Sequence, residues 1–169
     1  AMSLGTKTVP KVYKIFGPGN QYVTMAKMHV SMQGTAIDMP AGPSEVMVVA
    51  DETANPAFIA ADLLAQAEHS TDSQSVLLCT SASIIEQTQA EVARQLELLP
   101  RKDLAAQSLA YSKLIRFDNA DDLTDFMNEY AAEHLILSVK DAYQFSRRVV
   151  NAGSVFLGNF TPESAGDYA

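Results

Sequence analysis

Short apolar runs alternate with stretches of helical periodicity over most of the chain. Residues 46–50, 76–80 and 135–139 are almost continuously apolar, which is typical of strands buried on both faces of a sheet. Asn55 and Pro56 indicate a helix start, since Asn is a favoured N-cap and Pro fits the first helical position. The pattern predicts strands at 46–50, 76–80, 114–117, 135–139 and 154–157, and helices from 56 and over 83–98, 104–111, 121–132 and 141–151.

Strands that alternate with helices form repeated βαβ units, and such units build a mostly parallel sheet. The sequence therefore predicts the α/β class, with a mostly parallel five-stranded sheet and helices on both faces. The pattern leaves the order of the strands open. Residues 12–16 and 22–32 predict one earlier strand and one helix, joined by the turn Gly17-Pro18-Gly19-Asn20. The length of 169 residues favours a single α/β domain, which we place at residues 5–169, with residues 1–4 resembling an expression remnant.

Composition narrows the possible partners. The chain holds 12 Lys and Arg against 20 Asp and Glu, a formal net charge of −8. Without a basic stretch, this balance argues against nucleic acid or an anionic membrane as the main partner. No apolar run approaches the roughly 20 residues of a membrane-spanning helix, and the amino terminus lacks the features of a signal peptide. The lone cysteine, Cys79, cannot form an internal disulfide, which favours a cytoplasmic protein. Its place beside Leu77 and Leu78 in a predicted strand indicates an inert core thiol.

Two glycine-containing segments resemble known motifs but lack a required residue. After the turn at 17–20, Tyr22 stands where the dinucleotide fingerprint G-x-G-x-x-G needs its third glycine, and no P-loop is present. A structural turn is the simpler interpretation. Ser44 follows Gly42 by two residues, but Val46 stands where a G-x-S-x-G nucleophile elbow needs glycine. A serine hydrolase is therefore weakly supported, and Ser44 is a candidate to hydrogen-bond a ligand at the mouth of the next strand.

Three polar groups could carry chemistry, and each has a simpler alternative. Gln66 and His69 share a face at the end of a predicted helix and could bind one Zn²⁺ ion, or His69 could simply interact with the helix dipole. Glu133 and His134 suit general acid–base chemistry if an irregular junction turns both to one site; otherwise they form an exposed loop pair. Asp167 follows the last strand, where open α/β sheets bind ligands, or is a surface aspartate near the chain end.

Several segments, in order along the chain, together resemble the histidinol dehydrogenase family. They span nearly the whole chain from about Gly5 onward, and as a set they are highly specific, unlike any one motif alone. The matching segments are KIFGPGN at 14–20, AIDMPAGPSE at 36–45, DLLAQAEH at 62–69, EHL at 133–135, AGSVFLG at 152–158 and TPESAGDYA at 161–169.

The resemblance implies a Rossmann-like sheet and a zinc-dependent, cytoplasmic homodimer that acts in histidine biosynthesis. Such an enzyme oxidises L-histidinol to L-histidine in two NAD-dependent steps through an aldehyde. The resemblance implies that Asn20 contacts NAD and that Ser44 contacts the substrate.

The resemblance also implies a role for each of the paired polar groups. Gln66, His69 and Asp167 would be zinc ligands that also lie against the substrate. His134 would be the general base. Glu133 would activate the water that attacks the aldehyde, and this acid–base pair would contact the substrate as well.

Two features depart from the family pattern. Ala132 stands where the family usually has proline before the Glu–His pair. The family's fourth zinc ligand, a histidine, is expected in a C-terminal region that has no counterpart up to Ala169. The chain thus resembles a central fragment of a larger multidomain enzyme, inactive alone and binding zinc weakly or not at all. The alternative, favoured by the missing phosphate fingerprint, is a doubly wound module that binds a small ligand without chemistry.

Overall fold

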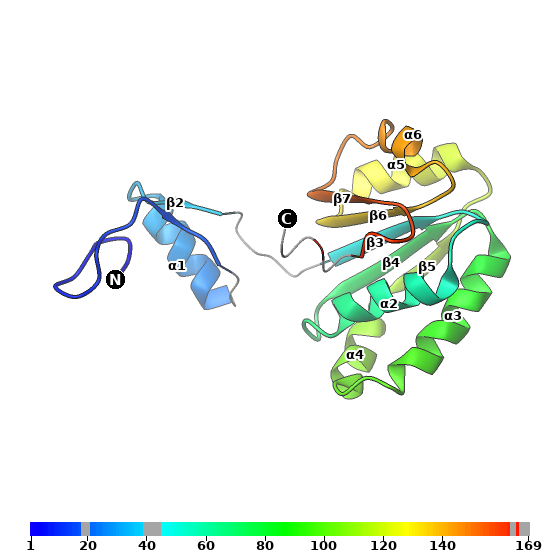
Figure 1. The fold of residues 1–169 in the computed structure, drawn as a ribbon, viewed down its shortest axis with the longest axis horizontal. Coiled ribbons are helices and arrows are strands. Elements are labelled where there is room, and N and C mark those ends of the chain that lie inside the picture. The colour runs from blue at the N-terminus through cyan, green and yellow to red at the C-terminus, as the bar shows by residue number, and fades with distance from the viewer. Residues whose placement is uncertain (18–20, 39–44, 163–164, 166–169) are drawn as a thin grey trace. The chain divides into compact units, whose positions relative to one another are not determined.

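The structure, a computed structural model, describes residues 1–17, 21–38, 45–162 and 165. It contains two compact units, Ala1–Gly42 and Pro43–Ala169 (Figure 1). The placement of a single α/β domain at residues 5–169 stays a prediction. Within the described residues, no helix is both long and apolar enough to cross a membrane.

The first unit is a small βαβ arrangement. Strands β1 (Lys14–Ile15) and β2 (Ala36–Ile37) pair in parallel, and helix α1 (Gln21–Ser31) connects them. Lys27 of α1 has a buried side chain, which forms an ion pair with Asp38 and donates a hydrogen bond to the Gly17 carbonyl oxygen. The strand predicted at 12–16 is shorter in the structure, where β1 has only two residues. Strand β2 also has only two residues, too few for a hydrophobic pattern to predict it.

The second unit contains a five-stranded sheet in which every neighbouring pair is parallel. The strand order is β5-β4-β3-β6-β7, which is the 3-2-1-4-5 order of a Rossmann-like sheet when β3 is counted first. This arrangement confirms the predicted fold class. The strands are β3 (Glu45–Ala50), β4 (Gln74–Cys79), β5 (Lys113–Arg116), β6 (His134–Ser138) and β7 (Ser154–Leu157).

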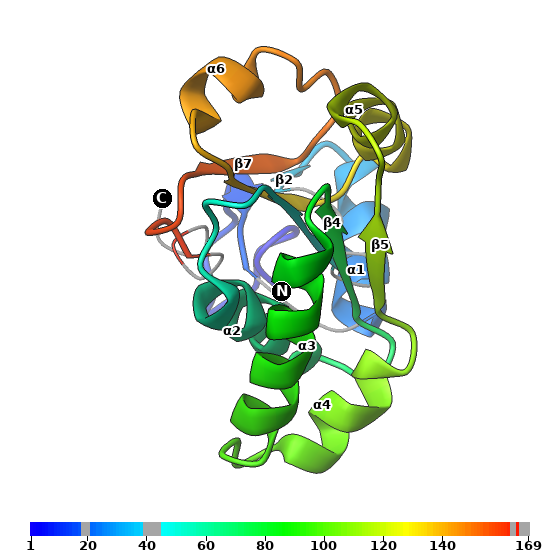
Figure 2. The ribbon, with the colours of Figure 1, turned by 90° about the vertical axis from the view of Figure 1, so that its right-hand side faces the viewer.

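Helices cover both faces of this sheet, as predicted (Figures 1 and 2). Because side chains alternate along a strand, Val46 and Val48 of β3 face the layer formed by α2 and α3, whereas Met47 and Val49 face α5 and α6. Each layer closes its own apolar cluster against the sheet. The helices are α2 (Pro56–Ala67), α3 (Ala82–Leu96), α4 (Lys102–Leu109), α5 (Ala120–Tyr130) and α6 (Ala142–Ser146).

Helix ends follow the sequence signals at α2 but not at α6. Asn55 caps α2 by accepting a hydrogen bond from the Ala57 N–H, with Pro56 in the first turn, as predicted. The helix predicted over 141–151 ends at Ser146 instead. The carboxamide of Asn128 accepts a hydrogen bond from the Val150 N–H and donates one to the Arg148 carbonyl oxygen, so a side chain on α5 replaces helical hydrogen bonding there.

Candidate functional site

Most of the candidate residues from the sequence gather at one edge of the second unit's sheet. We call the edge where the strands begin the amino edge, and the opposite one the carboxyl edge. His134 begins β6, and the register pairs it with Val46 near the start of β3. Helix α2 runs from the carboxyl end of β3 back to the start of β4, so its last turn, with Gln66, also lies at the amino edge.

The Glu133–His134 pair lies at an irregular helix–strand junction. Helix α5 ends at Tyr130, and Ala131 adopts the left-handed conformation with φ of 57°. Ala132 is buried, Glu133 lies in a bend and His134 is the first residue of β6. The chain direction therefore changes immediately before the pair. This is the kind of junction that the sequence argument required for both side chains to serve one site.

Strand β7 supports this junction through its backbone. The N–H of Gly153 donates to the carbonyl oxygen of Ala132 at 3.0 Å, and the N–H of Ser154 donates to that of Glu133 at 2.8 Å. The imidazole of His134 packs against the ring of Phe156 in a T-shaped contact, with ring centroids 5.9 Å apart. Both Glu133 and His134 are half-buried, so their side chains can reach a ligand without being fully exposed to water.

Gln66 is the clearest sign of a missing partner at the amino edge. Its side chain is 0% exposed, and neither its Oε1 nor its Nε2 atom has a hydrogen-bond partner among the described residues. An unpaired buried amide costs on the order of 1–3 kcal/mol, so such groups normally have a partner. A metal ion would give the Oε1 atom a partner, so Gln66 fits the role of zinc ligand that the sequence suggested for it.

His69 follows α2 rather than lying on it. The helix ends at Ala67 with Glu68 as its C-cap, and the His69 N–H closes the turn by donating to the Gln66 carbonyl oxygen at 3.1 Å. The His69 side chain is exposed. Gln66 and His69 are thus within one turn of each other. They do not share a helical face as predicted, because the helix ends before His69.

The remaining candidates lie outside the described residues. Asn20, Ser44 and Asp167 fall in the undescribed segments 18–20, 39–44 and 166–169, so their roles stay predictions. Within the part of the chain that the structure describes, no three His, Cys, Asp or Glu side chains are grouped closely enough to hold a metal ion. A zinc site would therefore depend on Gln66, on His69 and on residues beyond the described part.

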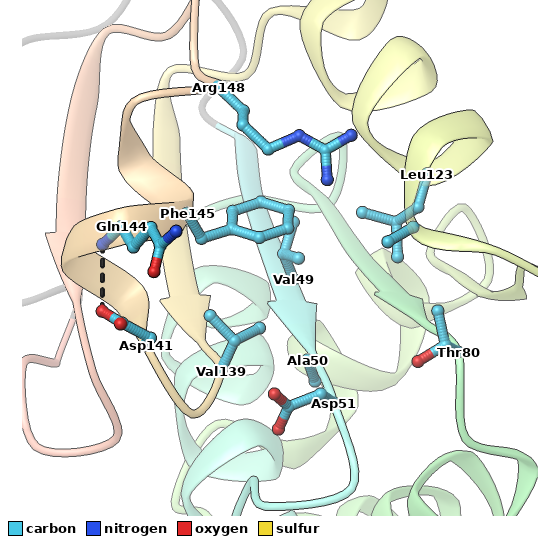
Figure 3. A pocket seen from close by; sticks show the side chains of 11 residues that line it. Val49, Ala50, Asp51, Thr80, Leu123, Val139, Asp141, Gln144, Phe145 and Arg148 are labelled. Carbon is cyan, nitrogen blue, oxygen red and sulfur yellow. Dashed lines mark hydrogen bonds between the residues drawn. The ribbon is translucent and has the colours of Figure 1, made fainter.

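The carboxyl edge carries a cavity of about 330 Å³ that sequence reasoning missed (Figure 3). Its floor is apolar, with Leu123, Val139 and Phe145 directed into it. The only sequence signal was that Asp51 and Asp141 closely follow buried strands.

The charged residues that line this cavity already form hydrogen bonds or an ion pair within the chain. Asp51 accepts hydrogen bonds from the N–H groups of Thr53 and Lys140, each at 2.8 Å. Asp141 caps α6 by accepting from the Gln144 N–H. Arg148 forms an ion pair with Asp121 at 2.5 Å. The charged groups of the carboxyl edge thus already have partners within the chain, whereas the amino edge presents the half-buried candidates Glu133 and His134 and an unpaired carboxamide.

Cys79 has no part in either edge's chemistry. It is completely buried in β4, and this burial raises the pKa of its thiol above the ordinary value. A buried thiol with a raised pKa has little thiolate and therefore little reactivity. This environment agrees with the inert core thiol that the sequence predicted.

Comparison with known proteins gives one consistent family. The sequence model described as histidinol dehydrogenase matches residues 1–169. The histidinol dehydrogenase of Bacteroides thetaiotaomicron is 59% identical over 169 residues, and that of Pseudoalteromonas translucida is 61% identical over 171 residues. In both cases the match covers all of this chain and 40% of the relative, so the chain spans well under half the length of the curated relatives it matches.

A solved structure gives the same result in three dimensions. The crystal structure of histidinol dehydrogenase from Elizabethkingia anophelis superimposes with a TM-score of 0.91 at 55% sequence identity. The superposition covers 98% of this chain and 38% of that chain. The similarity therefore extends over both compact units.

Proposed function

This chain belongs to the histidinol dehydrogenase family, and we propose that it is a section of an enzyme that oxidises L-histidinol to L-histidine in two NAD-dependent steps. The observation that carries the proposal is the Glu133–His134 junction, which presents a carboxylate and an imidazole at the same edge of the sheet as the unpaired Gln66 carboxamide. The names of the relatives support a role in histidine biosynthesis and a nicotinamide cofactor. A cytoplasmic homodimer is part of the same proposal.

His134 suits the role of general base in both oxidations. An alcohol loses a hydride from carbon and a proton from oxygen, and NAD supplies the hydride acceptor when it is bound. A neutral imidazole nitrogen accepts a proton, so His134 can take the hydroxyl proton as the hydride departs. Its contact with Phe156 holds the ring in one orientation. Asn20 would contact NAD, and Ser44 would contact the substrate.

Glu133 suits the step that turns the aldehyde into a second oxidisable group. A water molecule adds to the aldehyde carbon, and its proton passes to the Glu133 carboxylate. The hydrate carries a C–H bond and a hydroxyl group, so it can lose hydride and proton as the alcohol did. The product is the carboxylic acid, and each oxidation reduces one NAD.

Gln66, His69 and Asp167 would hold a zinc ion, together with a ligand from outside this chain. When bound, zinc would orient the imidazole and amine groups of the substrate, which is a positioning role. The burial of Gln66 without a hydrogen-bond partner among the described residues supports this assignment. His69 follows the end of α2, and its exposed side chain can turn toward the same ion.

The test uses the full-length protein that carries this section. His134→Gln should lower kcat by about 10²–10⁴-fold with little change in the KM for L-histidinol, because a general base acts in the transition state. Glu133→Gln should mainly slow the aldehyde-to-acid step. Exposed residues of the same types provide matched controls, and His29→Gln and Glu129→Gln should leave both steps unchanged.

Three outcomes would contradict parts of the proposal. A full-length protein that forms no NADH from L-histidinol would refute the activity. Binding of L-histidinol without NADH formation would favour the non-catalytic ligand-binding module instead. Equal losses in both half-reactions for Glu133→Gln would refute its role in activating water.

A further inference from the structure

Gly153 is exposed, yet the structure leaves no room for a side chain there. A Cβ atom at this position would lie 2.5 Å from the carbonyl oxygen of Glu133 and 3.2 Å from its Cα atom. Both are backbone atoms, so no side-chain rotation can relieve the contact. The φ angle of Gly153 lies outside the left-handed region, so the requirement for glycine comes from close approach and not from conformation.

Two backbone hydrogen bonds hold Gly153 close to the backbone of Glu133. The N–H groups of Gly153 and Ser154 donate to the carbonyl oxygens of Ala132 and Glu133, at 3.0 and 2.8 Å. Real Cβ atoms essentially never approach another atom closer than 3.0 Å, so any L-residue at 153 must widen the contact by about half an ångström or more. The displaced backbone is that of Glu133, and His134 follows directly.

The same strand also fixes the ring of His134. Phe156 is only 6% exposed, and it lies in the apolar cluster between the sheet and α2. The register pairs Ser154 with His134 and Phe156 with Ile136, so the two rings are diagonal neighbours on one face of the sheet. Their planes meet at 67°, the edge-to-face arrangement that aromatic pairs prefer.

We infer that the start of β7 positions the catalytic pair, with Gly153 setting the backbone at Glu133 and Phe156 setting the imidazole plane of His134. This inference rests on the proposed function. Neither residue touches the substrate in this assignment; both act through the pair. Since a misplacement of about 1 Å can cost a hundredfold in rate, a backbone shift of this size should impair turnover more than binding.

The experiment measures steady-state kinetics of the full-length protein with L-histidinol and NAD. Gly153→Ala should lower kcat by about ten- to a hundredfold while KM changes by less than about threefold. Phe156→Leu, which keeps an apolar side chain but removes the ring, should lower kcat by about tenfold with a similar KM. Leu123→Ala is the control for lost stability, because Leu123 is buried like Phe156 and in the same unit, but lies at the carboxyl edge.

The control separates positioning from simple destabilisation. Leu123→Ala should lower the unfolding temperature at least as much as Gly153→Ala does and retain the kcat of the unmodified enzyme. Unchanged kcat in Gly153→Ala, or an equal loss of kcat in Leu123→Ala, would overturn the inference. If Gly153→Ala does not fold, Phe156→Leu decides, and an unchanged kcat there would overturn it. An unmodified enzyme without NADH formation would instead refute the proposed function.

Discussion

At the scale of single residues, the amino edge contains a group that folding alone does not explain. The Gln66 carboxamide is completely buried, and its polar atoms have no hydrogen-bond partner among the described residues. The half-buried Gln95 carboxamide, by contrast, donates to the Ala57 carbonyl oxygen at 2.9 Å. Retaining an unpaired amide in a core costs stability. We therefore expect Gln66 to serve a ligand at the expense of stability.

This argument predicts that Gln66→Met stabilises the 169-residue protein by about 1 kcal/mol, because methionine fills a similar volume without an amide to desolvate. Chemical denaturation at neutral pH measures the change. The comparison substitution Gln95→Met should instead destabilise by about 1 kcal/mol, since it removes the hydrogen bonds that Gln95 donates to the Ala57 carbonyl oxygen and the Glu91 carboxylate. A loss of stability in Gln66→Met would mean that the amide has a partner after all.

At the scale of elements, the junction between α5 and β6 is held in a strained conformation. Ala131 is the only non-glycine residue in the described part of the chain with a positive φ, and its N–H still closes the helix by donating to the Met127 carbonyl oxygen. Alanine in the left-handed region costs roughly 1–2 kcal/mol, and glycine is the usual residue there. The strain lies two residues before Glu133, where the chain must turn sharply.

Replacing Ala131 by glycine should therefore stabilise the protein by about 0.5 kcal/mol, because relief of strain outweighs the greater entropy of the unfolded chain. The neighbouring Ala132→Gly provides the control. Ala132 is buried and has no positive φ, so its substitution should destabilise by about 1 kcal/mol. Urea denaturation of both variants checks the prediction, which fails if they change stability in the same direction.

The first unit contains an ion pair that links its helix to its second strand. The hydrogen bond from Lys27, and next the Gly17 N–H, lower the pKa of the Asp38 carboxyl below its ordinary value. A carboxyl whose pKa is lower in the folded state stabilises that state above the unfolded pKa of about 3.9, and this contribution is lost as pH falls through the folded pKa. The unit should therefore loosen in acid.

We expect backbone amides of Ala36 and Asp38 to lose exchange protection below about pH 4, once corrected for intrinsic exchange rates. Asp38→Asn should reduce this protection at neutral pH and remove its dependence on acid. Asp118→Asn, at an exposed ion pair of the second unit, is the control and should leave both amides unchanged. Acid dependence that persists in Asp38→Asn would exclude the ion pair as its cause.

Local sequence patterns predicted the helices and strands of the second unit well. They predicted less well where these elements end and in which order the strands lie. The apolar run at 46–50 identified a strand buried on both faces, and Asn55 with Pro56 identified the start of α2. The end of α6 could not be predicted, because the carboxamide that replaces its hydrogen bonds comes from Asn128, about 20 residues earlier. Strand order likewise depends on how helices pack on each face, which no local pattern contains.

The candidate site was predictable from residue types but not from spacing. Glu133 and His134 are adjacent in sequence, yet the cooperation that we propose for them depends on the strained turn at Ala131 and on the close approach of Gly153, just before β7. A glycine preceding a strand signals a turn in sequence, and only the structure shows that it touches Glu133. The burial of Gln66 without a partner is equally invisible in the sequence, because it depends on what packs around α2.

At the scale of the whole molecule, the two edges of the sheet differ in how far their polar groups are already paired. The carboxyl edge, where doubly wound sheets usually bind ligands, has its carboxylates committed to loop hydrogen bonds. The candidate site lies at the amino edge, where the described residues include an imidazole, a carboxylate and one buried amide. Since the chain covers only 40% of its curated relatives, we expect further site components to come from the rest of the enzyme.

The last prediction follows from this division. The 169-residue protein should fold, because its second unit closes an apolar cluster on each face of the sheet. It should bind zinc weakly and form no NADH from L-histidinol, since the proposed ligand Gln66 is neutral and a further proposed ligand would come from outside this chain. Elemental analysis after dialysis and an NADH assay, each run beside the full-length enzyme, measure both properties. One tightly held zinc ion per chain, or measurable turnover, would show that the ligands within residues 66–167 complete the site without the rest of the enzyme.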